Sequence, residues 1–286
     1  MNLNQWLTIY RKILNDRLLY NEIGKKTYTE YDLSLRRSSS LWGETPLVEI
    51  SVSNIANALS SIQNEGKSSA AYRFKVHLNN IFIEAQRDGV IPINHNPAAI
   101  VRTPRRIIKT QRLLIDEWRL IFEYAKYAAP EYFSNSMLLA LITGQRISDI
   151  VKMHHNDIFN GYLHVTQQKT NERIAIPTSL KLDEINFSLE DVISICSTSG
   201  NLLNYNNGKP VKTWAVSRWF KICRDSVLPK PITGKPPSFR EQRSLSERLY
   251  RAQGIDTMTL LGHKHQYMTD NYHDIRNKDY RRLIVE

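Results

Sequence analysis

Apolar residues in the first third of the chain recur every three or four positions, the spacing of one helical face. The first run comprises Trp6, Ile9, Tyr10, Ile13 and Leu14. A second run lies between Ser53, a capping residue type, and Gly66, a terminating one. A third opens at Ser68 or Ser69 and stops at Gly89. We therefore predict a helical domain over residues 1–102.

The rest of the chain begins with two further helical patterns. Asp116 is the expected N-cap of a helix that ends by Pro130. An apolar helix over residues 137–142 should then run into Thr143 and Gly144.

Strict alternation of apolar and polar residues occurs over 162–167 and again over 173–177. Alternation is the pattern of a half-buried strand, and the intervening residues favour a turn. We expect a β-hairpin with Lys169 near its tip. The segments that follow are mostly helical, with breaks at 204–210 and 229–237, so the predicted fold class is mainly α with a small β-sheet (α+β).

A basic segment separates the two regions. It surrounds Pro104, which resists helix continuation. Its cationic residues are Arg102, Arg105, Arg106, Lys109 and Arg112. We interpret residues 103–111 as an interdomain linker whose cations follow a phosphate backbone; a solvated loop is the alternative.

The charge balance favours a polyanionic partner. The 286 residues include 39 Lys and Arg against 28 Asp and Glu, a net charge of +11. Such an excess is typical of proteins that bind DNA or RNA rather than an acidic small molecule, although charge alone fits any basic soluble protein.

Cysteine and histidine usage indicates neither a metal site nor a disulfide framework. Cys196 and Cys223 are too few for either, and fit a reducing cytosol. The isolated histidines, most simply surface residues, are His154, His155, His164 and His265. The N-terminus lacks a signal-peptide core, and no apolar run could span a bilayer. We expect a cytoplasmic protein without metal.

Several arginines lie where they could bind a phosphate. Arg146 begins a predicted helix, and Asp149, one turn later, could hold its guanidinium; a plain surface salt bridge is the alternative. Arg240 and Arg243 are three positions apart and share one helical face. Cleaving a phosphodiester without metal needs such cations, a nucleophile and a proton donor.

A histidine and a tyrosine follow at a fixed spacing. His263 ends the run Leu260-Leu-Gly-His and lies nine positions before Tyr272. Either residue alone is more often an ordinary core or surface residue. Their joint occurrence after Arg243 makes coincidence a poor explanation.

These motifs resemble the tyrosine recombinase (phage integrase) family, most closely the lambdoid phage integrases. The resemblance implies that Arg146 and Arg243 are catalytic arginines and that His263 contacts the scissile phosphate or orients the tyrosine. It further implies that Tyr272 is the nucleophile and that Lys169 is the general acid for the 5′-hydroxyl leaving group.

Arg240 departs from the family pattern, which has a histidine three residues before the second arginine. Arginine binds phosphate but cannot accept a proton, so a general-base role at this position is in question. Two alternatives follow: a catalytically attenuated DNA-binding relative, or a type IB topoisomerase-like enzyme.

The resemblance also implies an architecture and a reaction. A core-type DNA-binding domain (1–102), the linker and a catalytic domain (112–286) would form a C-shaped clamp on duplex DNA. Four protomers would recombine two sites through 3′-phosphotyrosyl links, without cofactors and with accessory DNA-bending or directionality factors as further partners. The small arm-binding domain of lambdoid integrases would end about where this chain starts, so an arm-less or a truncated recombinase is expected.

Overall fold

The computed structural model of the protein describes residues 1–106 and 108–273. It divides into two compact units, Met1–Ile108 and Lys109–Glu286. The division falls inside the segment predicted to be a linker. Each unit encloses its own hydrophobic cluster, and the two clusters share no residue.

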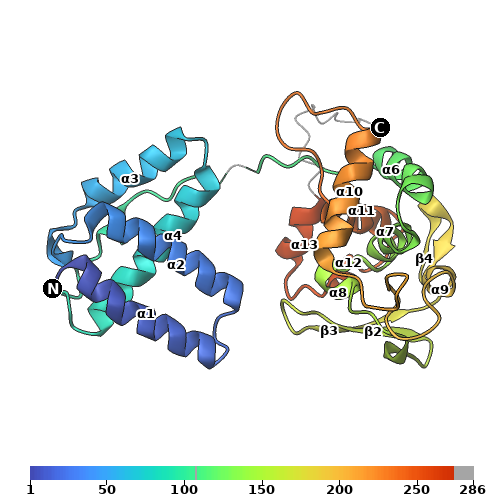
Figure 1. The fold of residues 1–286 in the computed structure, drawn as a ribbon, viewed down its shortest axis with the longest axis horizontal. Coiled ribbons are helices and arrows are strands. Elements are labelled where there is room, and N and C mark those ends of the chain that lie inside the picture. The colour runs from blue at the N-terminus through green and yellow to red at the C-terminus, as the bar shows by residue number, and fades with distance from the viewer. Residues whose placement is uncertain (107, 274–286) are drawn as a thin grey trace, which may run out of the picture. The chain divides into compact units, whose positions relative to one another are not determined.

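The first unit is built from helices (Figure 1). They are α1 (Leu3–Leu19), α2 (Lys25–Trp42), α3 (Val52–Asn64), α4 (Ser68–Arg87) and α5 (Pro97–Ile100), with a 3₁₀ turn, η1, at Leu47–Glu49. Trp6 is fully buried, and its indole N–H donates to the carbonyl of Ile81 at 3.1 Å, joining α1 to α4.

The predicted helices of this unit, α1, α3 and α4, are present, with one corrected cap. The apolar pattern missed α2 and the short α5. Ser51, not Ser53, caps α3, because Ser51 and Asn54 satisfy each other's backbone N–H groups. Helix α2 escaped prediction because its buried face includes Ser34 and Ser38, which interrupt the apolar stripe.

The second unit is mainly helical with a small sheet. Its helices are α6 (Ile115–Ala128), α7 (Glu131–Thr143), α8 (Ile147–Ile150), α9 (Leu189–Ser194), α10 (Thr213–Val227), α11 (Glu241–Ala252), α12 (Thr257–Leu261) and α13 (Gln266–His273), with 3₁₀ turns η2 (His155–Asp157) and η3 (Asp183–Ile185). Helix α6 begins after Leu114 rather than at a capping Asp116, because the Glu117 carboxylate accepts the Leu114 backbone N–H at 2.9 Å.

The predicted hairpin is confirmed. Strands β1 (Ile158–Phe159), β2 (Tyr162–Thr166) and β3 (Arg173–Pro177) form an antiparallel sheet in that order. Leu163 pairs with Ile176 and Val165 with Ile174, so one face of the hairpin is buried. A second pair, β4 (Lys181–Leu182) with β5 (Phe187–Ser188), was not anticipated.

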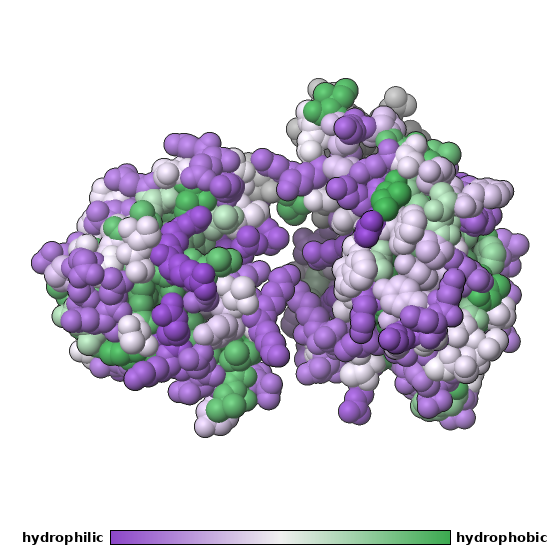
Figure 2. Space-filling view, in the orientation of Figure 1, coloured by the Kyte–Doolittle hydropathy of each residue, from purple (hydrophilic) through white to green (hydrophobic). Residues whose placement is uncertain are grey.

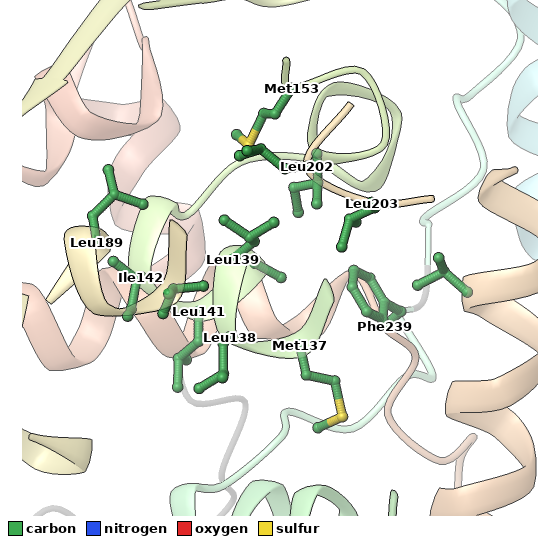
Figure 3. Packing of buried hydrophobic residues seen from close by; sticks show 14 of the residues in the cluster. Met137, Leu138, Leu139, Leu141, Ile142, Met153, Leu189, Leu202, Leu203 and Phe239 are labelled. Atoms are coloured by element: carbon green, nitrogen blue, oxygen red, sulfur yellow. The ribbon is translucent and has the colours of Figure 1, made fainter. Parts of the chain in front are cut away.

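Helix α7 lies at the centre of this unit, and every residue from Phe133 to Thr143 is buried. Figure 3 shows Leu139 and its α7 neighbours beside Leu202, Leu203 and Phe239, which come from distant parts of the sequence. On the face shown in Figure 2, hydrophilic residues predominate and apolar residues form separate patches. No helix among the described residues is long and apolar enough to cross a membrane.

Because the two cores are separate, we predict that core substitutions act on one unit at a time. Leu139→Ala and Phe82→Ala should each cost about 2–5 kcal/mol, the usual cost of truncating a buried side chain. In calorimetry, each variant should lower a different thermal transition and leave the other in place. A single transition shifted by both variants would contradict this expectation.

Candidate active site

Arg146 is positioned by the turn that ends α7. Gly144 adopts a left-handed conformation (φ +64°), and a Cβ there would lie 2.9 Å from Leu261. The chain then reverses, and Arg146 becomes the N-cap of α8. Its guanidinium donates to Gln167 Oε1 at 2.7 Å, which directs it toward the base of the β2–β3 hairpin.

Arg243 lies on α11 and is only 2% exposed. Its guanidinium donates to the carbonyls of Gly144 (2.7 Å) and Leu261 (2.6 Å), and Nη2 lies 3.2 Å from His263 Nε2. Burial, together with the charge of Arg146, lowers the pKa of Arg243 to about 10, so it stays cationic at neutral pH. Two neighbouring arginines, one of them desolvated, make this a strong site for an anion.

His263 follows α12, after the left-handed Gly262 (φ +61°). Burial, Arg243 and Arg146 lower the pKa of His263 to about 4, so the ring is neutral at pH 7. A guanidinium has only donors, so His263 Nε2 accepts from Arg243. The proton therefore sits on Nδ1, which donates to Thr269 Oγ1 at 2.9 Å.

Tyr272 lies on α13 against these groups. Its ring centroid is 5.3 Å from that of His263, and Arg243 Cζ lies 5.5 Å from the Tyr272 centroid. Burial alone would raise the pKa of the phenol. The charge of Arg243, a hydrogen bond from Arg240 and the charge of Arg146 outweigh burial, so the pKa of Tyr272 is lowered. The three cations therefore stabilise the phenolate, the nucleophilic form, relative to a phenol in water.

The structure thus brings together Arg146, Arg240, Arg243, His263 and Tyr272. Arg240, the N-cap of α11, is exposed as a whole residue while its guanidinium reaches the phenol.

Two predicted site residues, Lys169 and Asp149, form no hydrogen bond or ion pair with this group in the part of the chain that the structure describes. Lys169 occupies the exposed hairpin turn, and no hydrogen bond or ion pair within the described residues joins it to the arginines. Asp149 makes no ion pair with Arg146 there, which corrects its predicted supporting contact. Its Oδ1 accepts from Gln168 N at 2.9 Å, so this carboxylate holds the hairpin turn instead.

The predicted phosphate-contacting cations also divide. Arg102, Arg105, Arg106 and Lys109 are exposed. Arg112 is 7% exposed and forms an ion pair with Glu241 at 2.9 Å, so its assignment as a DNA contact is corrected. A cation that is removed from water in this way needs a carboxylate partner, and Glu241, the first residue of α11, supplies it.

Sequence reasoning missed two buried amides that link the site. Gln167 Nε2 donates to Gln145 Oε1 (2.8 Å) and to the Leu261 carbonyl (3.0 Å), while Gln145 Nε2 donates to the Leu260 carbonyl (2.8 Å). The amides therefore join the Arg146 turn, the hairpin and the chain before His263. Gln145 stands beside Arg146 in the sequence, and Gln167 lies two positions after Val165 in the alternating run, on the face that buries Leu163 and Val165. Those two positions are the signals that could have found the amides.

Residues 111–279 match the profile of the phage integrase family. The chain is 39% identical over 296 residues to the integrase of Enterobacteria phage P21, covering 100% of this chain and 77% of that protein. It is 40% identical over 292 residues to prophage integrase IntE of Escherichia coli (strain K12), covering 98% and 77%. The chain belongs to the phage integrase family. As the motifs predicted, it is a tyrosine site-specific recombinase, and neither alternative is favoured.

Solved structures agree over the whole chain. A lambda integrase fragment, crystallised as a dimer bound to a COC′ core site, matches with a TM-score of 0.91 and 33% identity, covering 100% of both chains. A lambda integrase tetramer bound to a Holliday junction matches with a TM-score of 0.91 and 32% identity, covering 100% of this chain and 81% of the other. The predicted fold class is confirmed.

The depressed pKa of His263 gives a testable titration. By NMR, the His263 ring should titrate near pH 4 rather than near the ordinary value of about 6.5. The unfolded chain takes up this proton first, so His263 should reduce stability as pH falls from about 6.5 to 4. His263→Asn, which assigns the resonance, should weaken that dependence. A His263 midpoint near 6.5 would show that the ring is not held neutral.

Proposed function

We propose that this recombinase cleaves and rejoins duplex DNA at specific sites through Tyr272. The observation that carries the proposal is the placement of the phenol against Arg243 and Arg240, with its pKa lowered despite burial. A structural tyrosine needs no cations beside its phenol oxygen. A nucleophile that attacks a phosphate does, because the cations stabilise both the phenolate and the charged phosphate.

In the proposed step, the Tyr272 oxygen attacks phosphorus and the bond from phosphorus to the 5′ oxygen breaks. The products are a 3′-phosphotyrosyl link and a free 5′-hydroxyl. Arg146 and Arg243 stabilise the charge on the nonbridging oxygens. Lys169 gives a proton to the leaving oxygen, which requires its turn to approach the bound DNA.

Strand exchange is the reverse step with a different partner. A 5′-hydroxyl from the second duplex attacks the phosphotyrosyl link and releases Tyr272. The bond energy is retained in the covalent link, so the chemistry requires neither a nucleotide cofactor nor a metal. The result would be integration or excision of a phage or another mobile element.

In this scheme Arg240 does not accept the phenol proton. Its hydrogen bond and its charge instead stabilise the Tyr272 phenolate. The phenol proton passes to solvent rather than to residue 240, because a guanidinium has no acceptor.

We propose that the partners are double-stranded recombination sites bound by four protomers, in the host cytosol. The lambda integrase structures, a dimer on a core site and a tetramer on a Holliday junction, support this assembly. The exposed cations Arg102, Arg105, Arg106 and Lys109 would contact phosphates. Accessory DNA-bending or directionality factors complete the proposal.

Tyr272→Phe should abolish the covalent DNA adduct on a nicked suicide duplex while leaving DNA affinity nearly unchanged. Removing one hydroxyl eliminates the nucleophile and alters no charge, and charge dominates affinity for DNA. Tyr267→Phe is the matched control, because Tyr267 is an exposed residue on the same helix. An adduct that persists in Tyr272→Phe would identify another nucleophile.

Arg240→His should cleave at the wild-type rate or more slowly. The substitution removes a permanent cation from the phenol, and phosphoryl transfer depends chiefly on charge stabilisation and positioning. The measurement is the single-turnover cleavage rate across pH 5–9. A large gain in rate with a new inflection near the imidazole pKa of about 6.5 would instead show that proton acceptance limits the natural enzyme.

A further inference from the structure

The last turn of α13, which carries Tyr272, is held by side chains from outside the helix. Ser244 Oγ donates to the Tyr272 carbonyl at 2.6 Å. Arg112 Nη2 donates to the neighbouring carbonyl of Asn271. A hydrogen bond from a cationic donor such as Arg112 is stronger than one from a neutral donor such as Ser244.

Arg112 is itself fixed in place. Its side chain is 4% exposed and ion-paired with Glu241 at the start of α11. The next residue, Leu113, offers its carbonyl to Arg248 of the same helix at 2.6 Å. Just before Arg112, Lys235 N donates to the Lys109 carbonyl at 2.7 Å. Hydrogen bonds at Lys109 and Leu113 therefore hold the chain on either side of Arg112, whose guanidinium donates to α13.

The geometry of α11 makes these contacts relevant to the nucleophile. Ser244, which holds the Tyr272 backbone, adjoins Arg243, whose guanidinium lies over the Tyr272 ring. One helix therefore supplies both the cation and a backbone anchor. Arg112 supplies a second hydrogen bond to the same turn, and two such bonds oppose a rotation of α13 that would move Tyr272 away from Arg243.

We propose that Arg112 is a positioning residue for the nucleophile, not a phosphate contact. Resting on the proposed role of Tyr272, this assignment makes Arg112 and Ser244 a two-point clamp on the last turn of α13. Arg112 stands at the start of the catalytic unit, so the clamp also fastens that start to the helix that carries the attacking group.

The first test needs no catalysis. Arg112→Met keeps the aliphatic stem and removes both donor groups. Amide hydrogen exchange over residues 267–273 of the DNA-free protein should accelerate by about ten- to a hundredfold, the factor expected for losing a hydrogen bond to a charged group. Arg119→Gln is the matched control: this arginine on α6 pairs with Glu184 at the surface and should leave that exchange unchanged.

The second test separates positioning from DNA contact. Arg112→Met should lower the single-turnover rate of adduct formation by at least about tenfold at saturating DNA, with an unchanged slope of log affinity against log salt. Arg105→Gln should do the reverse, lowering the slope by up to about one unit with little effect on the saturated rate. The proposal would be overturned if Arg112→Met left amide hydrogen exchange over residues 267–273 as slow as in the wild type and reduced the slope of log affinity against log salt.

Two further variants distinguish the loss of the clamp from general misfolding of Arg112→Met. Arg112→Met leaves the Glu241 carboxylate buried without its ion-pair partner, so the double variant Arg112→Met, Glu241→Gln removes that cost and should retain the same exchange and rate phenotypes. Ser244→Ala should shift exchange and rate in the same direction by a smaller factor, since a neutral donor is lost. If wild-type protein formed no adduct, the recombinase chemistry would fail while the exchange experiment still tested the clamp.

Discussion

The catalytic unit depends on a buried cation. Arg243 is nearly inaccessible to water, and a desolvated guanidinium is tolerated only when its donors are satisfied. Its Nη1 and Nη2 donate to the Gly144 and Leu261 carbonyls, from the turn after α7 and the end of α12. Satisfying one side chain thus requires three separate segments to converge, and each of them carries or adjoins a residue of the site.

The same convergence creates an unbalanced site. Burial and the charge of Arg146 lower the pKa of Arg243, and burial and the charges of both arginines lower the pKa of His263. The Arg243 Nε has no partner among the described residues. Asp149, whose charge acts on Arg243, forms no ion pair with either arginine among the described residues, and its Oδ1 accepts from the backbone N–H of Gln168 in the hairpin turn. The protein accepts this local cost, which an anion between the arginines would relieve; such stored electrostatic strain is typical of catalytic sites.

Much of this organisation follows from local sequence. Helical spacing predicted α1, α3, α4 and α7, because a helix must bury one face whatever it packs against. Alternation predicted the β2–β3 hairpin for the same reason. Helix α2 was missed because serines occupy part of its buried face. Small polar residues can be buried there, but they do not contribute to the apolar pattern from which helices were predicted.

For the site, too, the sequence predicted one part and the tertiary structure decided another. Residue type and spacing made Arg146, Arg243, His263 and Tyr272 candidates, since planar cations and a phenol suit phosphodiester chemistry, and the resemblance to the family supplied their predicted roles. The partners of each group depended on the tertiary structure. Arg112 and Asp149 have the residue types of a phosphate contact and an arginine partner, yet they hold backbone groups far away in sequence. A sequence shows which side chains are charged, whereas only the folded chain decides which carbonyls and amides reach them, because hydrogen bonds act over about 3 Å.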